Sequence, residues 1–210
     1  MNRRTGAWMI ALMILVTACG AVWAQEEGAE PEAVIFEQPV LITSIGQSAG
    51  AAQARVLAIK AGLDATYNQR TSVEELESFA TLIVVMGASS KGLGAAGVDI
   101  DGEIEWATEL IDKAIELGIP VIAMHIEGDS RRGASSDLIA TTFAPQADYL
   151  IVKGSMPDTE WTEDEAADGN KDGLFTTLAA EGEIPIAYIT KTLDAIDVLV
   201  EIFGITTDEE

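Results

Sequence analysis

Cysteine and histidine are almost absent from this sequence of 210 residues. The one cysteine is Cys19 and the one histidine is His125. The chain beyond Cys19 therefore has no thiol, which excludes disulfides, cysteine-ligated zinc and thiol catalysis there. A single histidine also excludes zinc sites built on paired histidines.

Basic residues are also scarce. Lysine and arginine together number 12 against 35 aspartates and glutamates, which gives a formal net charge of −23. A field of that sign repels phosphate backbones and anionic lipid surfaces, so nucleic acid is excluded as a partner. We interpret the charge mainly as a source of solubility or an adaptation to salty surroundings, with cation binding at acidic clusters as the alternative.

The first long apolar run lies at the beginning of the chain. Two arginines precede the apolar residues 7–18, and no acidic residue occurs before Glu26. This pattern predicts a signal peptide over residues 1–24, too short for a membrane span. Cleavage after Ala24 predicts a periplasmic or extracellular protein, whereas a lipobox ending in Cys19 predicts a lipid anchor.

The rest of the chain divides by composition. Residues 25–36 are acidic and contain proline, which is typical of a tether, and residues 205–210 form an acidic tail. Between them, residues 37–204 show no internal repeat and no change in composition that would mark a second domain. They are expected to form a single α/β domain.

Within that domain, short apolar runs alternate with amphipathic ones. The expected strands are 39–45, 64–69, 81–87, 120–126, 148–153 and 184–189. The expected helices are 50–62, 102–117, 136–143 and 192–204. This alternation predicts a three-layer sandwich with a mostly parallel sheet of five or six strands, wound as in flavodoxins or as in Rossmann folds. Ligands of such sheets sit beyond the carboxyl ends of the strands, here the loops 44–49, 87–102, 127–135 and 154–172.

The first of these loops joins a strand to a helix. Ser44, Gly46, Gln47 and Ser48 would bring small polar groups and free backbone N–H groups to a helix start, which suits an anion. With Thr43, the loop resembles the phosphate loop of flavodoxins, although later loops lack the aromatics that a flavin needs. The alternative is that Ser48 caps the helix and Gly46 makes the turn.

The second loop is rich in glycine. It contains Gly-x-Gly-x-x-Gly over 92–97, but the pattern does not lie in a tight strand-to-helix turn and so does not predict a dinucleotide site. Ser89, Ser90 and Lys91 follow a central strand, and the lysine could select a negatively charged group. A solvated loop is the alternative.

The third loop holds an adjacent pair of arginines. Arg131 and Arg132 could clamp a carboxylate or phosphate, or pair with neighbouring acids. His125 lies near the end of the preceding strand, where packing is a commoner role than catalysis.

The fourth loop resembles the opening of a calcium loop. Asp168, Asn170 and Asp172 alternate around a glycine turn, and calcium prefers such oxygens. The twelfth position is Ala179 instead of glutamate, so a solvated turn before a helix is the alternative.

The layout across residues 37–204 resembles exported bacterial α/β families of unknown function, a resemblance that implies no activity. We hypothesise a module that binds a small anionic ligand, and expect no cofactor except possible calcium. The alternatives are a hydrolase or transferase that uses His125 or a divalent cation, and a non-catalytic domain that contacts an envelope protein. Contact with a membrane would come only from the signal peptide or a lipidated Cys19.

Overall fold

The computed structural model describes residues 36–157, 159, 161 and 167–206. The expected signal peptide, Cys19, nearly all of the tether and most of the acidic tail lie outside these residues. No helix among the described residues is long and apolar enough to cross a membrane.

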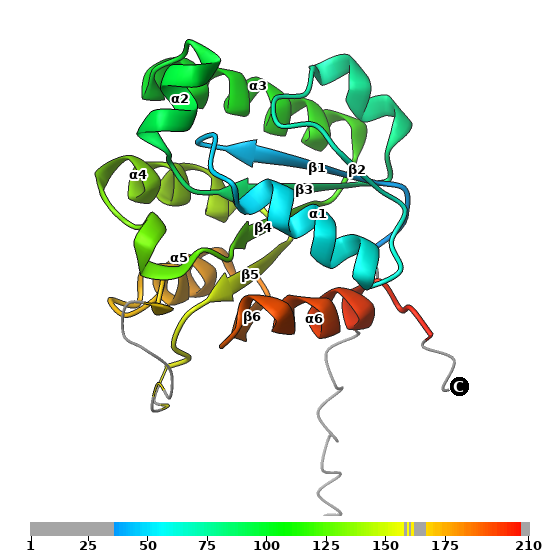
Figure 1. Ribbon diagram of the computed structural model, residues 1–210. Helices are drawn as coiled ribbons and strands as arrows, with labels where there is room; N and C mark the ends of the chain where they lie inside the picture. The colour runs from blue at the N-terminus through cyan, green and yellow to red at the C-terminus, as the bar shows by residue number, and fades with distance from the viewer. Residues whose placement is uncertain (1–35, 158, 160, 162–166, 207–210) are drawn as a thin grey trace, which may run out of the picture. The chain divides into compact units, whose positions relative to one another are not determined.

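A parallel sheet of six strands organises the fold (Figure 1). The strands are β1 Val40–Ile45, β2 Ala65–Tyr67, β3 Thr81–Met86, β4 Val121–His125, β5 Tyr149–Lys153 and β6 Ile186–Ile189. Their order is β2-β1-β3-β4-β5-β6, which is the flavodoxin-like winding and not the Rossmann order. The expected fold class is confirmed.

Within the described residues, six α-helices and four 3₁₀ segments connect the strands or, in the case of η5 and α6, follow the last one. The α-helices are α1 Gly50–Lys60, α2 Ser90–Ala96, α3 Ile100–Leu117, α4 Ala134–Phe143, α5 Leu174–Gly182 and α6 Ala195–Ile202. The 3₁₀ segments are η1 Val73–Ser78, η2 Gly128–Arg131, η3 Ala144–Gln146 and η5 Thr192–Asp194.

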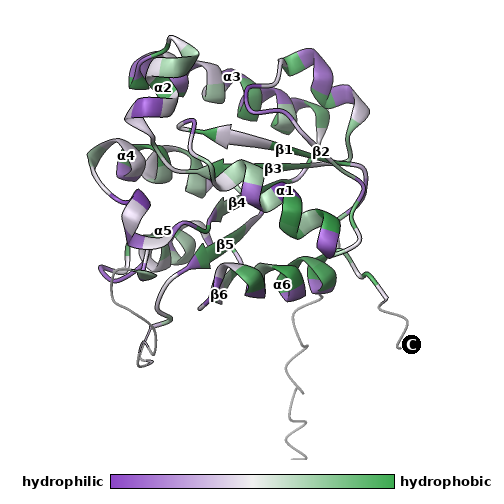
Figure 2. Ribbon diagram, viewed as in Figure 1, coloured by the Kyte–Doolittle hydropathy of each residue, from purple (hydrophilic) through white to green (hydrophobic). Residues whose placement is uncertain are grey.

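The sheet separates two apolar cores. Helices α1 and α6 cover one face, seen in front of the sheet in Figure 1, and α3, α4 and α5 cover the other. Strand β3 is buried along its whole length, because its alternate side chains enter both cores. The central strands β3, β4 and β5 are accordingly mostly hydrophobic in Figure 2.

The segment after β3 differs from the sequence expectation. The expected loop 87–102 contains α2, with Ser89 as its N-cap, whose Oγ accepts the N–H of Gly92 at 3.1 Å. Helix α3 also begins two residues earlier than expected, because Asp99 caps it and accepts the N–H of Gly102 at 2.9 Å. Asp101 lies in the first helical turn, where an acid interacts well with the helix dipole.

Candidate functional site

A cavity of about 400 Å³ lies at the carboxyl ends of β1, β2 and β3. The chain leaves β1 toward β2 on one side and leaves β3 toward β4 on the other, so the cavity lies at the topological switch point. We call it the switch-point cavity; it is lined by Gln47, Ser48, Ala49, Ala52, Tyr67, Gln69, Ser89, Lys91, Gly92, Ala95 and Arg131. Five of the nine predicted ligand residues are among them.

The loops after β1 and β3 are joined by backbone contacts. The Ser89 N–H donates to the Gly46 carbonyl at 2.7 Å, and Gly46 has φ +103°, which favours glycine. A Cβ on Gly46 would lie 2.5 Å from the carbonyl oxygen of Gly87, and one on Gly92 would lie 2.0 Å from that of Gln47. Gly46 in the first loop and Gly92 in the second therefore permit the two loops to pack closely.

A buried carboxylate holds the first loop in place. Glu103, at the start of α3, is fully buried and accepts the Gly46 N–H at 2.8 Å, the Gln47 Nε2 at 2.7 Å and the Arg70 guanidinium at 2.6 Å. The Arg70 guanidinium also lies over the Trp106 ring, 4.5 Å from its centre. These bonds fix Gln47 at φ +60°, an unusual conformation for a residue with a side chain.

The start of α1 forms one wall of the cavity. Its N-cap is Ala49, which offers no side-chain cap, and the Ser48 hydroxyl accepts the N–H of Gly50 at 3.2 Å. An uncapped helix start presents N–H groups and positive potential, which suits an anion.

A second buried carboxylate lies behind this helix start. Glu127 follows β4, and its side chain is 10% exposed. Its Oε1 accepts the Arg131 Nε at 3.0 Å, whereas Oε2 has no hydrogen-bond partner among the described residues. A Cβ on Gly50 would lie 2.7 Å from Oε2 and 2.9 Å from Val85 Cγ1, so a larger residue at this turn of α1 would displace one of these side chains.

Two cations reach the cavity from different loops. Lys91 is exposed on α2, and Arg131 comes from the end of η2 with its side chain 32% exposed. Among the described residues, Arg131 is bonded through Nε alone, which leaves its terminal nitrogens available. A guanidinium fork and a mobile ammonium are both suited to anions.

Arg132 does not line this cavity. Its side chain is 9% exposed and donates to Asp137, to both carboxylate oxygens of Asp172 and to the carbonyl of Gly169. The bonds to Asp172 and Asp137 raise the pKa of the Arg132 guanidinium, and the bond to Asp172 has the largest effect. The same bond lowers the pKa of the Asp172 carboxyl. Arg132 therefore ties the third loop to the fourth.

Two other predicted residues lie beside the cavity. Ser44 is fully buried at the end of β1, and its Oγ has no hydrogen-bond partner within the described ranges. Ser90 is the first residue of α2 and does not line the cavity.

His125 is packed inside the protein. Nδ1 lies 3.1 Å from the Met86 carbonyl oxygen and Nε2 lies 3.1 Å from that of Gly128, while the ring stacks on Phe175 at 4.8 Å. Burial lowers the pKa of the imidazole, which favours its neutral form. Both ring nitrogens face backbone carbonyls, so no described nucleophile is paired with His125.

The predicted calcium ligands are already bonded to protein groups. Asp168 accepts the N–H groups of Ser155 and Asn170, each at 2.8 Å, and Asp172 binds Arg132. No group of three or more histidine, cysteine, aspartate or glutamate side chains among the described residues is arranged to hold a metal. Calcium binding stays a prediction.

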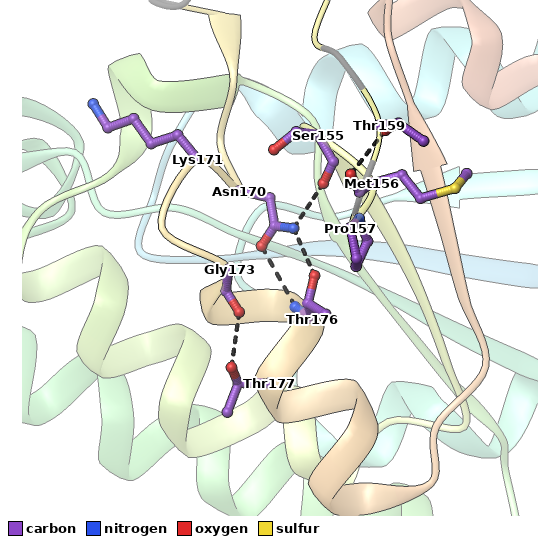
Figure 3. Close-up of a pocket in the computed structure, with 9 residues that line it drawn as sticks. All are labelled: Ser155, Met156, Pro157, Thr159, Asn170, Lys171, Gly173, Thr176 and Thr177. Carbon is purple, nitrogen blue, oxygen red and sulfur yellow. Dashed lines mark hydrogen bonds between the residues drawn. The ribbon is translucent and has the colours of Figure 1, made fainter.

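A second cavity, of about 370 Å³, adjoins this loop (Figure 3). The Asn170 amide lies at its centre and donates to the Ser155 carbonyl at 2.9 Å and to the Thr176 hydroxyl at 2.8 Å. Lys171 extends away from these groups in Figure 3 and pairs with Asp129. Among the described residues, this cavity thus directs no unpaired charge inward, unlike the switch-point cavity.

The sequence of this chain is similar to that of a known protein family. Residues 37–203 match the sequence model of a domain of unknown function, DUF6305. The chain belongs to this family. The DUF6305 match covers all six strands and all six α-helices of the described fold.

No curated protein matches this DUF6305 chain. Among solved structures, it is similar to a mutant of the esterase AlinE4, with 11% identity, 84% of this chain and 87% of that chain covered, and a TM-score of 0.28. A likeness at that score does not bear on the activity of the DUF6305 domain.

Sequence reasoning did not assign the two carboxylates that shape the DUF6305 cavity. The available signal was the position of Glu127, an acid that follows Ile126 just after the buried strand β4, at the edge of the sheet where ligands bind. Tyr67 and Gln69 also line the cavity from the weak second strand.

Proposed function

We propose that this protein binds a small anionic ligand in the switch-point cavity. The observation that supports this most is the convergence of Lys91 and Arg131, from separate loops, on the uncapped start of α1. The volume of about 400 Å³ is typical of a small-molecule site.

The local charge supports the same proposal. The formal net charge of −23 gives the molecule a field that repels anions at long range. Lys91, Arg131 and the helix start attract an anion at short range, where nearby charges dominate over screened distant ones. Binding would therefore be specific to this site and weakened by salt.

The test is the thermal stability of the purified protein in the presence of a panel of phosphates, sulfate and carboxylates. An anion that binds the folded state raises the melting temperature, since it stabilises only that state. Arg131→Ala and Lys91→Ala are each expected to remove most of this shift. Lys60→Ala is the matched control, because Lys60 is an exposed lysine in the last turn of α1, at the far end of the helix.

Two results would contradict the proposal. If both cavity variants keep the full anion-induced shift, the ligand binds elsewhere. If no anion in the panel shifts the wild-type protein, and native mass spectrometry finds no co-purified small molecule, the non-catalytic partner domain becomes the better hypothesis.

We also propose that the protein is exported. The support is the basic start, the apolar run 7–18 and the small residues before Gln25. The test is the intact mass of the protein from its natural host. A chain that starts at Gln25 indicates release, a lipidated Cys19 indicates an anchor, and an uncleaved chain contradicts export by this signal.

A further inference from the structure

The side chains around the switch-point cavity carry too little unpaired positive charge to favour a ligand with two negative charges. Lys91 and Arg131 are positive, but Glu127 is bonded to Arg131 at 3.0 Å and offsets its charge. Behind Gln47, the buried pair of Arg70 and Glu103 is also neutral. One unpaired cation and the partial charge of about +0.5 at a helix start remain for the ligand.

We infer that Glu127 is a specificity-determining residue, which restricts the ligand of this cavity to a single negative charge, as in a carboxylate or a phosphodiester. This inference rests on the proposed function. It names the ligand class that the same site accepts, and it assigns a role to a buried carboxylate that the fold does not otherwise explain.

Glu127 is close enough to act on the ligand. The Cβ position on Gly87 lies 3.4 Å from Glu127 Oε2 and also 3.4 Å from Ser48 Oγ, so these two oxygens are at most twice that distance apart. Ser48 lines the cavity beside the α1 start. An anion that is hydrogen-bonded to Ser48 therefore lies no farther from Glu127 Oε2 than roughly 7 Å plus one hydrogen-bond length.

Burial makes that charge effective. Glu127 Oε2 is inaccessible to solvent and has no hydrogen-bond donor within the described ranges, so it is poorly solvated, and the bonded counter-charge of the carboxylate is Arg131. At about 10 Å and an effective dielectric constant of about 20, a second unit of ligand charge is disfavoured roughly fifteenfold. Water in the open cavity reduces the expected penalty to about tenfold.

The position of Glu127 distinguishes its pair with Arg131 from an ordinary salt bridge on the protein surface. A surface salt bridge would leave both partners in water, where the net effect on nearby charges is small. Here the carboxylate lies under the start of α1, against Gly50, where the site itself attracts anions. The protein thus places its own negative charge beside the subsite for the ligand's charge.

The experiment measures binding of three probes to the purified full-length protein at pH 8 by isothermal titration calorimetry at low salt. Dimethyl phosphate and acetate carry one charge, whereas methyl phosphate carries two, because its second pKa is near 6. The wild-type protein is expected to bind dimethyl phosphate at least about tenfold more tightly than methyl phosphate. A preference between acetate and dimethyl phosphate then identifies the carboxylate or the diester as the ligand class.

Two variants isolate the role of the charge. Glu127→Gln is expected to raise the affinity for methyl phosphate about tenfold more than that for dimethyl phosphate. Glu181→Gln removes the same charge from an exposed position in the last turn of α5 and is expected to leave the ratio unchanged. If Glu127→Gln does not fold, Glu127→Asp keeps the charge and must keep the wild-type preference.

The outcomes separate this inference from the proposed function. Tighter wild-type binding of methyl phosphate, or an equal effect of Glu127→Gln on both phosphates, overturns the inference and leaves anion binding intact. Absence of binding by all three probes contradicts the proposed function itself.

Discussion

Replacement of Glu103 by alanine tests how the first loop is held. Glu103 is fully buried and accepts hydrogen bonds from Gly46, Gln47 and Arg70. Without the carboxylate, the Gly46 N–H and the Gln47 amide become buried donors with no acceptor, at about 1–3 kcal/mol each. The Arg70 side chain is one-third exposed and regains water, so its contribution is smaller. We expect a loss of about 3–4 kcal/mol in the free energy of unfolding.

Urea unfolding at pH 7, followed by circular dichroism, measures this loss. Glu103→Gln keeps one acceptor oxygen but turns an NH₂ group toward a donor, so we expect a loss between that of Glu103→Ala and zero. Glu105→Ala is the matched control, because Glu105 is exposed on the same helix, and little change is expected. A loss below about 1 kcal/mol for Glu103→Ala would refute the reasoning, since the loop would then be held by other contacts.

Two further predictions concern a glycine pair and His125. Gly92→Ala is expected to lower the melting temperature and weaken anion binding, because its Cβ would meet the Gln47 carbonyl at 2.0 Å; Gly94→Ala, with open space around it, should be neutral or stabilise α2 by up to about 1 kcal/mol. Equal melting temperatures for the two variants would contradict the close packing of the loops. His125 has a pKa lowered by burial from 6.5, so the unfolded chain takes up its proton first as the pH falls. Its contribution to stability is therefore complete above pH 6.5 and decreases below it, by at most about 1.4 kcal/mol per pH unit. Urea titrations between pH 7 and pH 5 should show this slope in the wild type and a smaller one in His125→Gln, and identical slopes would count against it.

The fold was predictable because its signals are local. Continuous apolar runs such as that of β3 are long enough to identify buried strands, and their alternation with amphipathic runs implies a parallel sheet. The order of the strands was not predictable, because it depends on contacts between distant segments. Short α2 was missed because its glycines have low helix propensity, and the Ser89 cap compensates for that.

The candidate site was predictable only in part. Lys91 and Arg131 follow strands whose ends meet, so their convergence follows from the topology. Arg131 and Arg132 are indistinguishable in sequence, yet one lines the cavity and the other binds Asp172. That difference arises because η2 ends between them, and no pattern in the sequence sets the end of a 3₁₀ turn.

The backbone bond from Ser89 to Gly46 has a consequence for how a ligand would be received. Two loops that are bonded to each other and anchored by Glu103 have little conformational freedom left to lose on complex formation. Binding would then require only the ordering of a few side-chain torsions in Lys91 and Arg131, so even a weakly interacting ion would keep most of its contact energy as affinity. The free and occupied proteins should accordingly superpose in their backbones and differ in those two side chains.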